Sequence, residues 1–185
     1  MTTAADRNDL GKRAGWIALL TVATFLGSFV FACATPFAAL AALSALHMRK
    51  RDAFALTGVN FLANQIVGFG FLHYPHDSST IAWGAAIGVS AFVATAAAIG
   101  AVSLFRALPW AIAAVATFAV AVVAYELSLY AASAVLPTEA DAFSLQTVLY
   151  VVQVDGIAFA GLLVLQGIGQ MIGLASKPQT VAIAA

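Results

Sequence analysis

The chain has 185 residues, of which 63% are hydrophobic and only 9% are charged. A soluble domain needs about 25% charged residues to cover its surface, so this composition excludes an ordinary soluble globule and indicates that lipid is the solvent. Eight basic and eight acidic residues give a net charge of zero. The basic residues are too few and too dispersed for a nucleic-acid-binding surface.

Six apolar segments predict an all-α, polytopic membrane protein with six transmembrane helices in one bundle. We expect these helices at about residues 14–34, 36–48, 53–72, 80–105, 109–135 and 143–174. Residues 14–175 then form the transmembrane domain, and residues 1–13 and 176–185 are expected to be cytoplasmic tails. The second helix, with about 13 apolar residues or roughly 20 Å, is shorter than a bilayer core of about 30 Å. The corner between the first two helices should therefore lie recessed.

The N-terminal segment also has features of a cleaved signal peptide. Arg7, Lys12 and Arg13 precede an apolar run, and residues 32–34 form a small-residue pattern typical of a cleavage site. The apolar region of a signal is about 7–15 residues long, whereas the run over residues 16–34 has the length of a membrane span. We therefore expect the first helix to be retained.

The basic residues fall in alternate connections, which predicts the orientation of the chain. They precede the first helix, separate the second from the third and the fourth from the fifth, and follow the sixth. They are Arg7, Lys12, Arg13, Arg49, Lys50, Arg51, Arg106 and Lys177. Because cytoplasmic connections carry most of the Lys and Arg, both termini are expected on the cytoplasmic side of a bacterial inner membrane. The loop at residues 73–80 and the acidic turn at residues 136–141 should then face outward.

Several polar side chains lie within the apolar segments. They are Asn60, Asn64 and Gln65 in the third helix, Glu126 in the fifth, and Gln153 and Asp155 in the sixth. For the amides, one interpretation is hydrogen bonding between helices. For Glu126 and Asp155 we favour a hydrated or ligand-lined cavity, because no outward-facing Lys or Arg is available to pair with them.

The outward loop carries a His-x-x-His pair followed by a carboxylate: His73, His76 and Asp77. Imidazole and carboxylate groups can bind Zn, Cu, Co or Ni, and Cys33, the single cysteine, could add a thiolate. The alternative is an interfacial loop in which Tyr74 and Trp83 lie at the level of the lipid headgroups. For Cys33 the alternative is simple packing as a small apolar residue.

Two further patterns bear on function. The chain lacks the metalloprotease, serine-hydrolase and nucleotide-loop motifs, so we expect no enzymatic activity. Small residues recur at four-residue spacing in Gly84-x-x-x-Gly88 and Gly169-x-x-x-Gly173. Such faces let helices approach closely, either within the bundle or against a separate membrane partner.

The stretch NQIVGFGFLHYPHDSSTIAWG, at residues 64–84, resembles the cobalamin-type carriers among the substrate-binding (S) components of energy-coupling-factor vitamin transporters. This resemblance implies capture of a vitamin by outer loops and helix ends, with toppling in the membrane driven by a shared ATPase module. It also implies coupling to that module through small residues on the first helix, which Ala14-x-x-x-Ala18 matches. The loop between the first two helices, which often covers substrate in that family, is very short here.

The leading hypothesis is thus a transporter subunit that captures a vitamin-like small molecule, cobalamin among the candidates, from the outer face. Its ligand-binding residues would be Asn60, Asn64, Gln65, His73, Tyr74, His76, Asp77, Trp83, Glu126, Gln153 and Asp155. Cobalamin or a transition metal would be cargo, with His73, His76 or Cys33 approaching the metal, and no resident cofactor is expected. The alternatives are a metal-ion permease that uses His73, His76 and Asp77, and a structural accessory subunit of a larger membrane complex.

Overall fold

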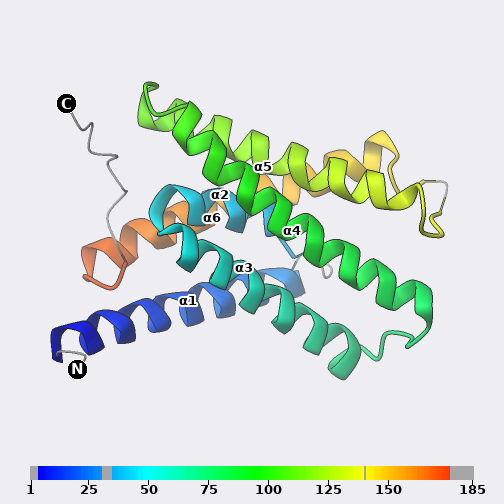
Figure 1. Ribbon diagram of the computed structural model, residues 1–185, viewed down its shortest axis with the longest axis horizontal. Coiled ribbons are helices and arrows are strands. Elements are labelled where there is room, and N and C mark those ends of the chain that lie inside the picture. Colours follow the sequence, from blue (N-terminus) through cyan, green and yellow to red (C-terminus); the bar gives the residue numbers. More distant parts are fainter. Residues whose placement is uncertain (1–3, 31–34, 140, 176–185) are drawn as a thin grey trace.

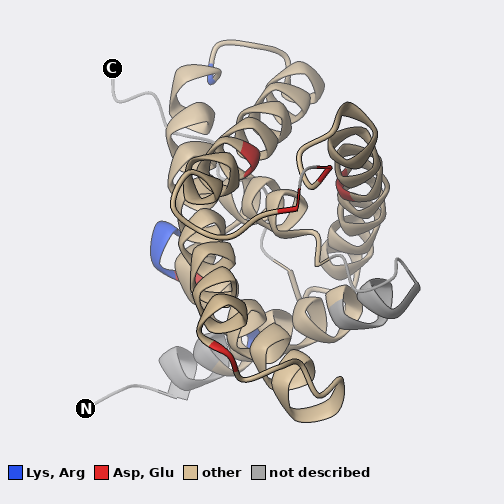
Figure 2. Ribbon diagram, turned by 90° about the vertical axis from the view of Figure 1, so that its right-hand side faces the viewer, with Lys and Arg blue, Asp and Glu red and all other residues tan. Residues whose placement is uncertain are grey.

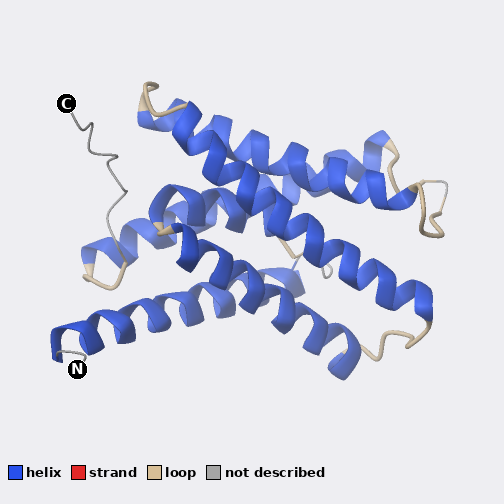
Figure 3. Ribbon diagram, in the orientation of Figure 1, coloured by secondary structure: helices blue, strands red, loops and turns tan. Residues whose placement is uncertain are grey.

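The fold is helical throughout the part of the chain that the computed structural model describes, residues 4–30, 35–139 and 141–175 (Figure 3). The elements follow one another as α1 (Ala4–Val30), α2 (Phe37–His47), α3 (Lys50–Gln65), the π-helix η1 (Ile66–Phe71), α4 (Ser78–Leu104), α5 (Trp110–Ser133) and α6 (Leu145–Met171). The all-α prediction is confirmed.

Among the described residues, four helical segments are long and apolar enough to cross a membrane. They are Lys50–Phe71, which joins α3 to η1, and the helices α4, α5 and α6, each with 22 to 27 residues. A span needs about 20 predominantly apolar residues, so these four fit a multi-pass membrane protein. The helix α2 has 11 residues and covers only about 16 Å at 1.5 Å per residue.

The short helix α2 occupies the centre of the bundle (Figure 1). Ten of its eleven residues are buried, and it packs against α3, α4, α5 and α6. Its sequence, FAALAALSALH, is apolar on almost every side, as expected of a helix that is surrounded by protein. Alanine side chains let the neighbouring helices approach closely, so α2 forms the core around which the long helices pack.

The two glycines of the Gly84-x-x-x-Gly88 pattern lie inside the bundle, where α4 contacts α3. A Cβ atom on Gly88 would lie 2.7 Å from the ring of Phe61, and one on Gly84 would lie 2.8 Å from the Gln65 Oε1 atom. Further along the same contact, the hydroxyls of Thr57 and Thr95 are hydrogen-bonded at 2.7 Å. This face of α4 therefore packs against α3.

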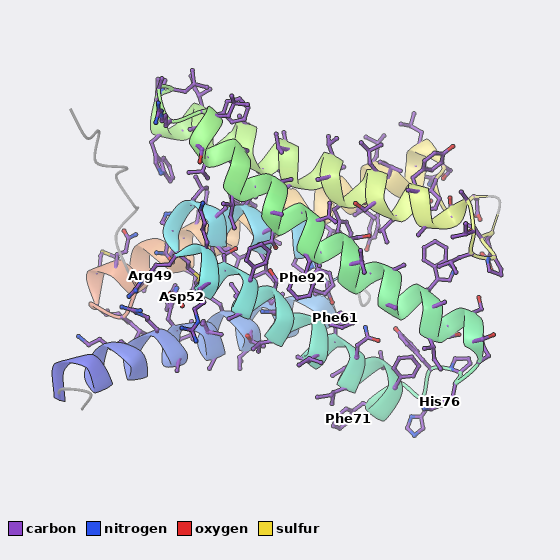
Figure 4. All side chains as sticks on the ribbon, in the orientation of Figure 1. Arg49, Asp52, Phe61, Phe71, His76 and Phe92 are labelled. Atoms are coloured by element: carbon purple, nitrogen blue, oxygen red, sulfur yellow. The ribbon has the colours of Figure 1, made fainter. Side chains whose placement is uncertain are left out.

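The charged residues distinguish the two ends of the bundle. The end with the α2–α3 and α4–α5 corners carries Arg49, Lys50, Arg51 and Arg106, and we call it the basic end. The other end carries the α3–α4 loop (residues 72–77) and the α5–α6 loop (residues 134–144), which contain Asp and Glu but no Lys or Arg (Figure 2). We call it the acidic end. Arg49 and His76 accordingly lie at opposite ends of the molecule (Figure 4).

Two local features differ from the sequence-based expectation. The first helix begins at Ala4, so the polar residues 4–13, expected to form a tail, are helical. The third helix ends in the π-helical segment η1, a wider turn that often occurs at functional sites.

Replacing Gly88 by Ala should destabilise the protein, because the added methyl group would overlap the ring of Phe61. Overpacking of this kind typically costs about 1–3 kcal/mol, measured as a lower free energy of unfolding in detergent. Gly100→Ala is the matched control on the same helix, since a Cβ atom there meets nothing within 4 Å. Equal effects of the two substitutions would contradict the close packing of α4 on α3.

Candidate functional site

A cavity of about 270 Å³ lies between α2, α5 and α6. Its walls come from the start of α2, the second half of α5, the first half of α6 and the α5–α6 loop, with single residues from α3 and α4. The lining residues are Thr35, Pro36, Phe37, Asn64, Ile87, Tyr125, Glu126, Leu129, Ala142, Phe143, Thr147, Val148, Val151, Val154 and Asp155. Because these segments adjoin the α5–α6 loop, the cavity lies in the half of the bundle nearer the acidic end.

Asp155 both lines this cavity and caps α2. Its side chain is only 3% exposed, and its Oδ1 atom accepts a hydrogen bond of 2.8 Å from the backbone N–H of Ala39. The first N–H groups of a helix have no partner within the helix, and Pro36, at the N-cap, supplies no side-chain acceptor. The carboxylate from α6 takes that role, and its negative charge is favourable beside the positive end of a helix dipole.

Glu126 lies half-buried on the α5 wall of the same cavity. Among the residues that the structure describes, none donates a hydrogen bond to its carboxylate or pairs with it as a cation. An intramembrane carboxylate without a protein partner usually faces a cavity or a transport path. Its position in the lining agrees with that general rule.

Asn64 completes the polar part of the lining. Its Oδ1 atom accepts a hydrogen bond of 2.9 Å from the hydroxyl of Thr35, which links the C-terminal end of α3 to the segment just before α2. The structure thus brings together Asn64, Glu126 and Asp155 from three different helices. These are three of the residues that the sequence singled out.

Aromatic rings form much of the remaining wall. Phe37 and Tyr125 lie with their ring centroids 6.1 Å apart, and Phe143, from the α5–α6 loop, packs edge-on against Tyr130 at 5.5 Å. Sequence reasoning did not assign Phe37 or Phe143 to the site. An aromatic residue just after an acidic turn was the available signal for Phe143, while nothing in the sequence pointed to Phe37.

Asn60 and Gln65 are not part of the cavity. Asn60 is buried and donates through Nδ2 to the Thr21 hydroxyl at 3.2 Å and to the Leu56 carbonyl at 3.0 Å, so it joins α3 to α1. Gln65 lies against Gly84 of α4. Asn60 lies about one helical turn before Asn64, nearer the basic end, whereas Gln65 is rotated by about 100° from Asn64 and faces α4.

Gln153 and Trp83 also lie outside the cavity lining. Gln153 is exposed on α6, because two residues along a helix reverse the direction of the side chain relative to Asp155. The indole N–H of Trp83 donates a hydrogen bond of 2.8 Å to the carbonyl of Pro137. Trp83 therefore fastens the α5–α6 loop to α4 and does not line the cavity.

The side chains of the α3–α4 loop contact the π-helical segment that precedes it. His73, with a φ angle of 56°, is hydrogen-bonded through Nδ1 to the Phe71 carbonyl at 2.8 Å. Tyr74 covers Gly68, and the ring of His76 packs against Phe69 at 5.3 Å. None of these loop side chains lines the cavity.

The proposed metal ligands are not assembled into a site. The described residues contain no group of three or more His, Cys, Asp or Glu side chains that could hold a metal ion, and Cys33 lies outside the described residues. Asp77 instead caps α4, accepting from the N–H groups of Ser79 and Thr80 and from the Thr80 hydroxyl at 2.8–3.0 Å. The hydrogen bonds from Thr80, its backbone N–H first, lower the pKa of Asp77.

Comparison of the chain with models of known protein families, with curated proteins and with solved structures finds no match. The chemistry of the site therefore has to be inferred from its own residues.

Replacing Asp155 by Ala should destabilise the protein, because it leaves the buried N–H of Ala39 without an acceptor. Loss of a helix cap costs about 0.5–2 kcal/mol, measured as the free energy of unfolding in detergent. Asp155→Asn keeps an acceptor oxygen and should lose less. Glu126→Ala is the control, since that carboxylate caps no helix, and an equal loss in this variant would contradict the capping role.

Proposed function

We propose that this chain is the substrate-binding subunit of a membrane transporter, which captures a small polar molecule at the acidic end of the bundle. The cavity at Asn64, Glu126 and Asp155 carries this proposal. Ionisable side chains are expensive to place within a membrane, and where they occur they usually mark a path for a substrate or an ion. The apolar side chains of the lining would shield the ligand from lipid.

The orientation of the chain is part of this proposal. We propose six spans with both termini in the cytoplasm of a bacterium, so that the acidic end faces outward. The positive-inside rule supports this orientation, since Arg49, Lys50, Arg51 and Arg106 lie at the basic end. The ligand would then enter from the side of the α3–α4 and α5–α6 loops.

The size of the cavity limits the size of the ligand that can bind. Pockets for drug-sized molecules have volumes of about 300–1,000 Å³, and the cavity, at about 270 Å³, is smaller. Cobalamin is far larger than a drug-sized molecule, so the volume favours a smaller ligand. His73 and His76, which make local loop contacts, have no part in its binding under this proposal.

The energising partner is proposed from the resemblance to S components. Ala14 and Ala18 lie on an exposed face of α1, and a Cβ atom on Gly15 would meet nothing within 4 Å. Small residues allow a second helix to approach closely. This face is available to an ATPase-driven coupling module in the membrane.

Protein purified in mild detergent should carry a small molecule in stoichiometric amount, detected by native mass spectrometry. Glu126→Leu should abolish this binding, because it removes a polar group from the cavity wall. Gln153→Leu is the matched control, since Gln153 is exposed on α6 and outside the cavity. A stoichiometric protein partner without any small molecule would favour a structural accessory subunit instead.

In a Cys33→Ala background, His76→Cys should react with a membrane-impermeant maleimide in intact spheroplasts. Arg106→Cys should react only after the membrane is permeabilised, because the two exposed positions lie at opposite ends of the bundle. Gel-shift labelling measures both reactions. The reverse pattern would place the cavity on the cytoplasmic side and overturn the proposed direction of capture.

A further inference from the structure

We infer that the ligand is a small organic cation with a single positive charge, an inference that rests on the proposed function. The cavity wall contains two carboxylates, Glu126 and Asp155, and no Lys, Arg or His among its lining residues. Charges in a medium of low dielectric constant interact strongly, and an uncompensated buried charge is costly. A cationic ligand would balance the negative charge of these carboxylates, which no described side chain does.

The two carboxylates differ in how far the protein itself balances their negative charge. Asp155 accepts the N–H of Ala39 at the start of α2, where the helix dipole is equivalent to roughly half a positive charge. Glu126 has no hydrogen-bond donor or cation among the described residues. One carboxylate is thus largely satisfied and the other is free, which matches a ligand with one positive charge.

The volume and the lining indicate an organic cation and argue against a bare metal ion. A single water molecule needs only about 10–15 Å³ of cavity, whereas this cavity offers about 270 Å³. No described cluster of His, Cys, Asp or Glu is suited to a metal. The rings of Phe37, Tyr125 and Phe143 line the site, and aromatic faces attract ammonium groups while also covering their apolar substituents.

The test compares three probes of nearly equal shape by calorimetry on the purified full chain. They are choline, its neutral carbon isostere dimethylbutanol and the dimethylbutanoate anion. We expect choline to bind on the order of tenfold more tightly than the neutral isostere, in keeping with a desolvated ammonium group beside a carboxylate and aromatic rings, and the anion to bind least. Glu126→Gln should remove this preference, and Gln153→Leu should keep it.

The possible results distinguish a failure of the cation inference from a failure of the proposed transporter function. Equal or tighter binding of the neutral or anionic probe overturns the cation inference and leaves the transporter proposal in place. Should no probe bind, the molecule that copurifies with the protein decides: a cation supports the inference, and a neutral or anionic molecule overturns it. Absence of both probe binding and a copurifying molecule overturns the proposed function as well.

Discussion

The hydrogen bond from Ala39 to Asp155 joins α2, at the centre of the bundle, to α6. It caps the first turn of α2 inside the bundle, where Pro36 offers neither a side-chain cap nor an N–H group. Because α3, α4, α5 and α6 all pack against α2, the position of this one helix end determines how the long helices meet. The cavity lies where α5 and α6 both approach that end, so the same contact that orders the core also shapes the site.

The polar residues of the membrane region divide into two groups with different physical roles. Asn60 and Thr57 form hydrogen bonds to Thr21 and Thr95, and join α3 to its neighbours. Asn64, Glu126 and Asp155 face the cavity instead. In an apolar medium each unsatisfied polar group carries a penalty, and Glu126, which no helix satisfies, is therefore where we propose that the ligand binds.

Sequence reasoning reached the helices and part of the site. Composition and apolar length were enough for an all-α chain with long spans, and the lack of a nearby Lys or Arg directed attention to Glu126 and Asp155, which line one cavity. Helical rotation decided the rest: Gln153 lies two residues from Asp155 yet is exposed on α6. Asp77 shows a second limit of sequence-based prediction. A carboxylate near two histidines has the spacing of a metal ligand, but in the structure this carboxylate accepts hydrogen bonds from Ser79 and Thr80. Such outcomes depend on which helices are neighbours, and an almost uniformly apolar sequence contains little information about that.

The double role of Asp155, which lines the cavity and caps α2, has a consequence for how the proposed ligand preference of this cavity could change in evolution. A substitution there alters the lining and uncaps α2 at once, so a variant that gains a new ligand also loses stability. Glu126 has no such duty, since it lines the cavity without a described protein partner. New specificities are therefore open to the chain at Glu126, on α5, while the aspartate on α6 is constrained by the fold it helps to build.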